Sequence, residues 1–273
     1  MAVAVIEVDD PSDVRLGDFY GLNDPELRRR RESDGEGDGF LVAEGVLVIR
    51  QLLASPYPVR SLLVTAKGLA DLEADLDGVD APVYLIGQTA MTAVTGFAFH
   101  RGALAAAARR PPIGLDEVAD GADLLVVAEG VNDNENLGGL FRNAAAFGAA
   151  GLVLDRASAD PLYRRAIRVS MGHSLRLPFA RVASAPAALA WLRAAGFEVL
   201  ALTPSSAGGS EDVRSVARRP RQALVVGAEG PGLTDAALAS ADRRIRIPMA
   251  AGVDSLNVAT AAAVALSQLS RSG

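Results

Sequence analysis

The chain has 273 residues, half of them hydrophobic and none of them cysteine, which excludes disulfides and thiolate metal sites and leaves material for one large or two ordinary cores. The net charge of −6 gives no general attraction to nucleic acid, although arginine supplies nearly all of the positive charge and suits two-pronged contacts with phosphate. No apolar run is long enough to span a bilayer, and the N-terminus lacks a signal-peptide pattern. We therefore expect a cytoplasmic protein with no membrane partner and no metal.

The first half of the chain alternates short apolar runs with amphipathic ones. Residues 1–38 are expected to be partly flexible, because 28–39 is charged, rich in glycine and without apolar periodicity; it is either a solvated loop or an arm that contacts RNA. Beyond it, the patterns predict strands over 40–43, 60–65 and 81–87 and helices over 44–54 and 89–95. This alternation indicates a small α/β domain over residues 1–112.

A Pro-Pro pair and nearby glycines interrupt the pattern and predict a linker over 113–121, followed by a second domain over 122–273. That domain alternates again, with predicted strands at 124–130, 151–155, 197–203, 223–230 and 244–249 and predicted helices at 138–147, 162–170, 187–195 and 257–269. Nearly continuous apolar strands separated by helices are typical of a parallel sheet that is covered on both faces.

A polar segment with three asparagines follows the strand at 124–130, at the edge where open α/β sheets bind ligands. Arg142 lies one and a half helical turns after Asn136, so both can face one crevice only if Asn136 precedes the helix. Asn136 could equally be a helix cap, and Arg142 a surface cation.

The strand at 223–230 runs into a loop with three glycines, Gly227, Gly230 and Gly232, around Glu229. Glycines here permit tight turns and close approach of the backbone to a ligand. The spacing is neither that of a dinucleotide-binding loop nor that of a P-loop. This argues against a nucleotide- or nicotinamide-dependent enzyme on an ordinary doubly wound sheet.

Near the C-terminus, Ser255 and Asn257 precede a helix of small residues. Either residue could cap that helix, which would be a sufficient structural reason for its presence. The alanines that follow permit close packing against another surface, including a second subunit.

Three segments, taken in order, resemble the motif set of the SpoU/TrmH family within the SPOUT methyltransferases. They are N-x-G-x-x-x-R-x-A-x-x-F-G at 136–148, V-G-x-E-G-x-G-L at 226–233 and I-P-M-x(5)-S-L-N-V at 247–258, with a weaker match, R-x-S-x-G…P-F, at 168–179. The first half resembles the family's RNA-recognition domain through GFLVAEG and TGFAFHRG, although the acidic insert at 32–38 departs from its spacing.

The resemblance implies a parallel-sheet domain with a deep trefoil knot, whose loops bind S-adenosyl-L-methionine, in a homodimer. The positions that match the family's cofactor-binding loops are Thr203, Gly227, Glu229, Gly230, Ile247, Met249, Ser255 and Leu256. Those that match its active site are Asn136, Arg142, Glu229, Ser255 and Asn257. The implied reaction is 2′-O-methylation of a ribose in structured RNA.

The resemblance leaves the role of Arg142 open between a general base and a cation that stabilises the developing oxyanion, and deprotonating a guanidinium is costly. Ribosomal RNA is the favoured substrate, and transfer RNA is the alternative substrate. A non-catalytic RNA-binding protein that keeps the knot is the alternative function. In a predicted loop and helix of the chain, the candidates for contact with RNA are His100, Arg101, Arg165 and Arg168.

Overall fold

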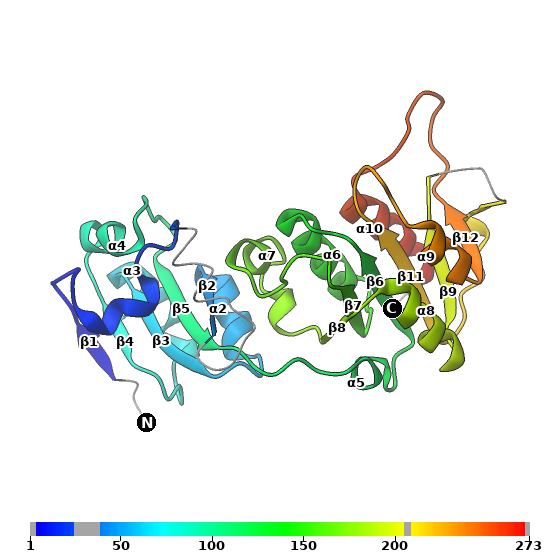
Figure 1. The fold of residues 1–273 in the computed structure, drawn as a ribbon. Helices are drawn as coiled ribbons and strands as arrows, with labels where there is room; N and C mark the ends of the chain where they lie inside the picture. The colour runs from blue at the N-terminus through cyan, green and yellow to red at the C-terminus, as the bar shows by residue number, and fades with distance from the viewer. Residues whose placement is uncertain (1–3, 25–38, 205–208, 271–273) are drawn as a thin grey trace. The chain divides into compact units, whose positions relative to one another are not determined.

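The computed structural model describes residues 4–24, 39–204 and 209–270 and divides into two compact units (Figure 1). The first unit comprises Met1–Pro111 together with Leu162–Arg176, and the second comprises Pro112–Pro161 together with Leu177–Gly273. The arginine run at 28–31 and the acidic insert at 32–38, with the predictions made for them, lie outside the described residues.

The first unit is a five-stranded mixed sheet with helices packed on it. The strand order is β1-β4-β3-β5-β2, in which β1, β4 and β3 run parallel and β5 runs antiparallel to both β3 and β2. Its strands are β1 (Val5–Glu7), β2 (Phe40–Glu44), β3 (Val59–Val64), β4 (Val83–Leu85) and β5 (Ala103–Ala108), and its α-helices are α2 (Val46–Leu53), α3 (Ala66–Leu72), α4 (Gln88–Thr95) and α7 (Arg164–Val169). The alanines of β5 are weak strand formers, and their pairing on both sides decides their conformation.

The second unit is built on a seven-stranded sheet of order β10-β12-β9-β11-β6-β7-β8, in which every neighbouring pair is parallel. Its strands are β6 (Leu124–Glu129), β7 (Gly151–Asp155), β8 (Phe179–Val182), β9 (Glu198–Leu202), β10 (Glu211–Asp212), β11 (Gln222–Gly227) and β12 (Arg243–Arg246). Its α-helices are α5 (Leu115–Ala119), α6 (Asn134–Ala146), α8 (Ala185–Ala194), α9 (Asp235–Ser240) and α10 (Val258–Leu269). The predicted α/β fold with a mostly parallel sheet is confirmed.

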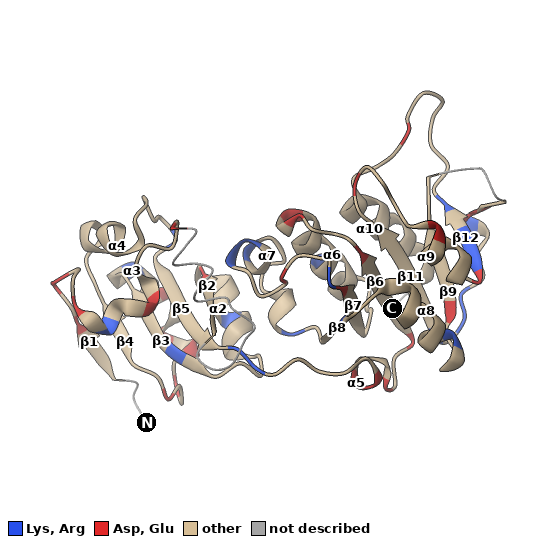
Figure 2. Ribbon diagram, in the orientation of Figure 1, with Lys and Arg blue, Asp and Glu red and all other residues tan. Residues whose placement is uncertain are grey.

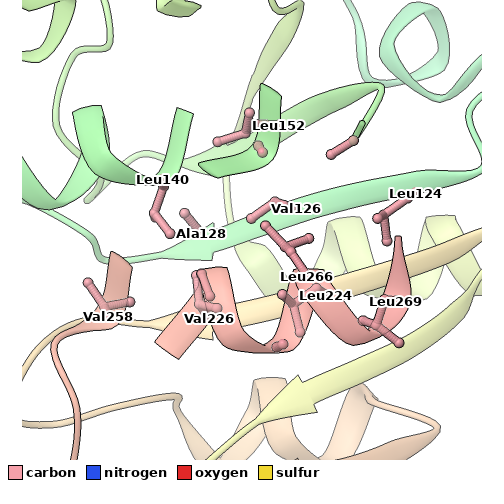
Figure 3. Close-up of a cluster of buried hydrophobic side chains, with 14 of the residues drawn as sticks. Leu124, Val126, Ala128, Leu140, Leu152, Leu224, Val226, Val258, Leu266 and Leu269 are labelled. Atoms are coloured by element: carbon pink, nitrogen blue, oxygen red, sulfur yellow. The ribbon is translucent and has the colours of Figure 1, made fainter. Parts of the chain in front are cut away.

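Both faces of this sheet are covered, which explains why its strands are almost continuously apolar. Leu124, Val126 and Ala128 of β6 point into a cluster with residues of α6 and α10, part of which Figure 3 shows. Leu125 and Val127 point the other way, into a cluster with α5, α8 and α9. Successive side chains of a strand alternate between faces, so a strand buried on both sides needs apolar residues throughout.

Helix α6 begins at Asn134, four residues before the predicted start at residue 138. The carboxylate of Asp133 accepts hydrogen bonds from the backbone N–H groups of Glu135 and Asn136, both at 2.9 Å, and so caps the helix. Asn136 therefore lies inside the helix and not in the loop before it.

The segment expected to be a linker, 113–121, folds as part of the second unit. It contains α5, whose Val118 and Ala119 are buried, and Ile113 forms a parallel bridge with Ala180 of β8. Conversely, 162–176 lies between two strands of the second unit in sequence but packs with the first unit, where α7 contacts β2. No helix within the described residues has the length and apolarity that a membrane span requires.

Candidate active site

The carboxyl ends of four adjacent parallel strands, β12, β9, β11 and β6, meet at one edge of the second sheet. Thr203 continues from β9, and its N–H donates to the carbonyl of Ile245, two residues before Ile247, at 2.9 Å. Gly227 pairs with Glu129 at the ends of β11 and β6. Loops from distant parts of the sequence therefore leave the sheet side by side, as ligand sites of such sheets require.

Three side chains from three of these segments are joined by hydrogen bonds. The amide Nδ2 of Asn257 donates to Oδ1 of Asn136 at 2.6 Å and to Oε1 of Glu229 at 2.7 Å. Asn136 is only 9% exposed, whereas Glu229 and Asn257 are exposed. Asn257 thus uses both of its N–H bonds to hold two acceptors together, with the carboxylate on the solvent side.

Asn257 is fixed by its position at the start of α10. Its Oδ1 accepts hydrogen bonds from the N–H groups of Ala259 and Thr260, both at 3.1 Å, and so caps the helix. Helix α10 in turn packs closely on α6. A Cβ atom added to Gly139 would lie 2.8 Å from the Cβ atom of Ala259. In addition, Nδ2 of Asn143 donates a hydrogen bond to the Ala259 carbonyl at 2.7 Å. The cap and the cluster are therefore two functions of one side chain.

The turn between β6 and α6 is held by a buried network that the sequence patterns did not reveal. Oδ1 of Asp155 accepts from the N–H of Gly130 at 3.0 Å and from the hydroxyl of Ser158 at 2.7 Å. The Ser158 hydroxyl accepts from the N–H of Val131 at 3.2 Å. These contacts fix the turn that leads into α6. The only local signal for them is an aspartate at the end of an otherwise apolar strand.

The glycine loop after β11 folds tightly on itself. A Cβ on Gly227 would lie 2.3 Å from the carbonyl carbon of Gly232, and Ala228 forms an antiparallel bridge with Gly232. Gly230 and Gly232 have φ angles of 86° and 71°, which favour glycine. A second glutamate, Glu129, is buried at 7% exposure and binds the far end of this loop at Thr234.

Arg142 does not join the cluster around Asn257. With both residues inside α6, six positions place Arg142 about 120° around the helix from Asn136 and about 9 Å along its axis. Its side chain is exposed, and among the described residues the structure gives it no ion pair or hydrogen bond. The condition for Asn136 and Arg142 to share one crevice within a subunit, that Asn136 precede the helix, is not met.

The third motif lies mostly in a segment that runs out from the end of β12 and returns to α10 (Figure 1). Met249 is half-buried, while 250–257, which includes Ser255, is exposed throughout. Val253 and Leu256 are 48% and 38% exposed. The segment thus carries two exposed apolar side chains and ends at Asn257, which is hydrogen-bonded to Glu229 of the glycine loop.

The four candidates for contact with RNA all belong to the first unit. His100 and Arg101 lie in the loop before β5, and Arg165 and Arg168 lie on α7, where Figure 2 shows positive charge. Arg101 and Arg168 both approach the carboxylate of Glu44. Among the described residues, no group of histidine and acidic side chains is arranged to hold a metal ion.

Similar proteins share both the sequence and this fold. The model of the SpoU rRNA Methylase family matches residues 123–267. An uncharacterized tRNA/rRNA methyltransferase of Mycobacterium tuberculosis strain H37Rv is 48% identical over 270 residues, which cover 98% of this chain and 93% of that protein.

Two solved structures align over nearly the whole chain. The AdoMet-bound rRNA methyltransferase of Sinorhizobium meliloti has a TM-score of 0.79 at 25% identity and covers 97% of both chains. The SpoU methyltransferase AviRb of Streptomyces viridochromogenes, in complex with the cofactor AdoMet, has a TM-score of 0.75 at 25% identity over 94% of this chain and 97% of that one. On the family match and the full-length relative, this chain belongs to the SpoU rRNA methylase family.

Proposed function

We propose that this protein transfers the methyl group of S-adenosyl-L-methionine to the 2′-hydroxyl of a ribose in structured RNA, with ribosomal RNA as the favoured substrate. The observation that carries the proposal is the hydrogen-bonded cluster of Asn136, Glu229 and Asn257 at the carboxyl edge of a parallel sheet. Membership of an RNA methylase family supports the reaction class, and the solved relative named as an rRNA methyltransferase supports the substrate.

The residues at this edge fit the cofactor that both solved relatives hold. Exposed loop backbone offers hydrogen-bonding groups, and exposed Val253 and Leu256 offer apolar surface for the adenosine moiety. The exposed carboxylate of Glu229 suits the positive charge of a sulfonium. The residues proposed to hold the cofactor are Thr203, Gly227, Glu229, Gly230, Ile247, Met249, Ser255 and Leu256.

The cofactor supplies a methyl group on a good leaving group, so the protein must orient the hydroxyl and manage its proton. Asn136 presents its amide N–H groups to orient the sugar, Asn257 holds Asn136 in place, and Glu229 holds Asn257. Ser255 contributes to the wall of the site. Because Arg142 does not share the crevice of Asn136 within one subunit, it is proposed to act from the second subunit of the dimer. There it is a fixed positive charge for the developing oxyanion and the neighbouring phosphate, because guanidinium deprotonation is costly.

The assembly proposed for this reaction is a homodimer in the cytoplasm, with the chain of the second domain threaded in a trefoil knot. Val264 on α10 is 37% exposed, on a helix of small residues that permits close packing. A second subunit packed on this helix would cover Val264, which supports the dimer. The recognition domain is proposed to be residues 1–112 and the methyltransferase domain residues 122–273.

The proposal is tested by incubating the purified protein with labelled S-adenosyl-L-methionine and, separately, with ribosomal and transfer RNA from cells that lack the gene. Digestion to nucleosides identifies the product. A labelled 2′-O-methylnucleoside from ribosomal RNA is expected. A label on a base contradicts ribose methylation, and a label only in transfer RNA contradicts the favoured substrate. Absence of transfer with both RNAs supports the non-catalytic alternative.

A further inference from the structure

A buried glutamate in the first unit is surrounded by three arginines. Glu44, the last residue of β2, has a side chain only 5% exposed. Its Oε1 lies 3.3 Å from Nε of Arg101, and its Oε2 lies 3.4 Å from Nη1 of Arg164 and 4.0 Å from Nη1 of Arg168. We call these four residues the Glu44 cluster.

The charges of the Glu44 cluster do not balance. One carboxylate faces three guanidiniums, each with five N–H donors, so the side chains of these four described residues sum to two positive charges, in a chain whose net charge is −6. The side chains of Arg101 and Arg168 are 51% and 37% exposed, whereas that of Arg164 is 19% exposed. A stabilising ion pair for a buried glutamate needs one arginine. The two exposed ones add repulsion that a bound anion would relieve.

Arg101 directly precedes Gly102, whose backbone is tightly packed. The carbonyl of Gly102 accepts hydrogen bonds from the N–H of Thr65 at 2.9 Å and from its hydroxyl at 3.2 Å. Gly68 packs so closely that an added Cβ would lie 2.0 Å from the Gly102 carbonyl oxygen. The side chain of Arg101 also covers Gly45, with Cδ 3.5 Å from where a Cβ would stand.

Arg164, the first residue of α7, contacts Glu44 and further groups of the first unit. Its Nη2 donates to the carbonyl of Leu22 at 3.4 Å and to Oδ1 of Asn23 at 3.3 Å, and its guanidinium lies 5.1 Å from the centre of the Phe97 ring. With Arg164 anchored at several points, Arg168, one helical turn later, is carried to the same carboxylate. The two exposed guanidiniums are therefore preorganised by the fold, as a specific anion site requires.

We propose that the Glu44 cluster is a binding site for the phosphodiester backbone of RNA. Arg101 and Arg168 contact phosphate, and Glu44 and Arg164 are positioning residues that hold them. Arginine is suited to this because its planar fork matches two phosphate oxygens at once. Contacts of this kind fix the register of an RNA without reading its sequence. The proposal rests on the proposed function, since it supplies the recognition surface for the same substrate.

The test measures binding of fluorescently labelled, fragmented ribosomal RNA to the full-length protein over a range of salt concentrations. Arg101→Ala with Arg168→Ala is expected to weaken binding at low salt by about tenfold or more. It should also reduce the slope of log affinity against log salt by about 1.4, since each contact to single-stranded phosphate releases about 0.7 of a counterion.

The matched control removes two arginines of the same unit that are equally exposed but each paired with an aspartate. Arg15→Ala with Arg50→Ala changes the net charge by the same amount, at side chains that are 46% and 43% exposed. It should leave the slope unchanged. Arg101→Lys with Arg168→Lys keeps the charge but loses the fork, so it should keep most of the slope and lose affinity a few-fold.

An unchanged affinity and slope in the Arg101 and Arg168 alanine variant overturns the proposal, as does an equal loss in the control. If the alanine variant has a lowered melting temperature, the lysine variant is used in its place. An RNA affinity of the lysine variant equal to that of the wild type then overturns the proposal. Methyl transfer by the wild type is measured separately. If RNA binding depends on Arg101 and Arg168 as expected but the wild type forms no 2′-O-methyl product, the proposed function is overturned and the binding site is not.

Discussion

Glu129, at the end of β6, and Thr234, just before α9, are joined by two hydrogen bonds although they lie 105 positions apart. The N–H of Thr234 donates to Oε2 at 2.9 Å, and its hydroxyl donates to Oε1 at 2.8 Å. The same hydroxyl accepts from the N–H of Ala237 at 3.1 Å and caps α9. The far end of the glycine loop is thereby fastened to the strand next to β11.

Thr234→Val keeps the shape of the side chain and removes both contacts of its hydroxyl. We expect the free energy of unfolding to fall by about 1–3 kcal/mol, because the buried carboxylate of Glu129 loses a donor. The affinity for S-adenosylhomocysteine should also fall, since the loop is less fixed. Urea unfolding and calorimetry measure the two effects. Thr234→Ser, which retains the hydroxyl, should match the wild type; equal losses in both variants would contradict the assignment.

Gly227→Ala should disrupt the glycine loop. The new Cβ would lie 2.3 Å from the carbonyl carbon of Gly232 and 2.5 Å from the N of Leu233, and both are backbone atoms that cannot rotate away. We expect a loss of about 1–3 kcal/mol in unfolding free energy and much weaker binding of S-adenosylhomocysteine. Gly87→Ala is the control, because nothing lies within 4 Å of its Cβ position. Wild-type cofactor affinity in Gly227→Ala would show that the loop's shape is irrelevant to binding.

Two substitutions at Asn257 separate its function as a helix cap from its function in the cluster. Asn257→Asp keeps an oxygen for the N–H groups of Ala259 and Thr260 but replaces the amide donor with a second carboxylate beside Glu229. Asn257→Ala loses both functions. We expect stability to fall by about 1 kcal/mol in the alanine variant only, because of the lost cap.

Methyl transfer should fall at least tenfold, about 1.4 kcal/mol, in both Asn257 variants. Thermal unfolding and single-turnover transfer at saturating cofactor measure the two properties. Near-wild-type transfer in Asn257→Asp would mean that Asn257 is only a cap.

Arg142→Ala should abolish methyl transfer and leave the affinity for S-adenosylhomocysteine nearly intact, because the side chain is exposed and lies apart from the cluster around Asn257. Arg156→Ala, an equally charged change at another exposed position of the second unit, is the control and should retain turnover. Turnover in Arg142→Ala within about tenfold of wild type, roughly 1.4 kcal/mol, would refute the assignment.

The sequence alone determined the class of fold and the longer buried elements of the second domain. Strands β6, β9 and β11 were predicted because burial on both faces demands unbroken apolar runs, and helix α10 because it carries a cap and small residues. The order of the three motifs was sufficient to indicate the family. Local patterning carries this information because side-chain periodicity and caps act over a few residues.

Only the tertiary structure decided which of these residues meet. Asn136 and Asn257 lie 121 positions apart, and their contact depends on the packing of α6 on α10. Because Asp133 caps α6, the helix begins before Asn136 and contains both Asn136 and Arg142. The two side chains therefore point in different directions around the helix. The gathering of arginines from α7 around Glu44 likewise has no local signal. Such contacts arise when distant elements bury their apolar faces together, a cooperative outcome that no short window of sequence contains.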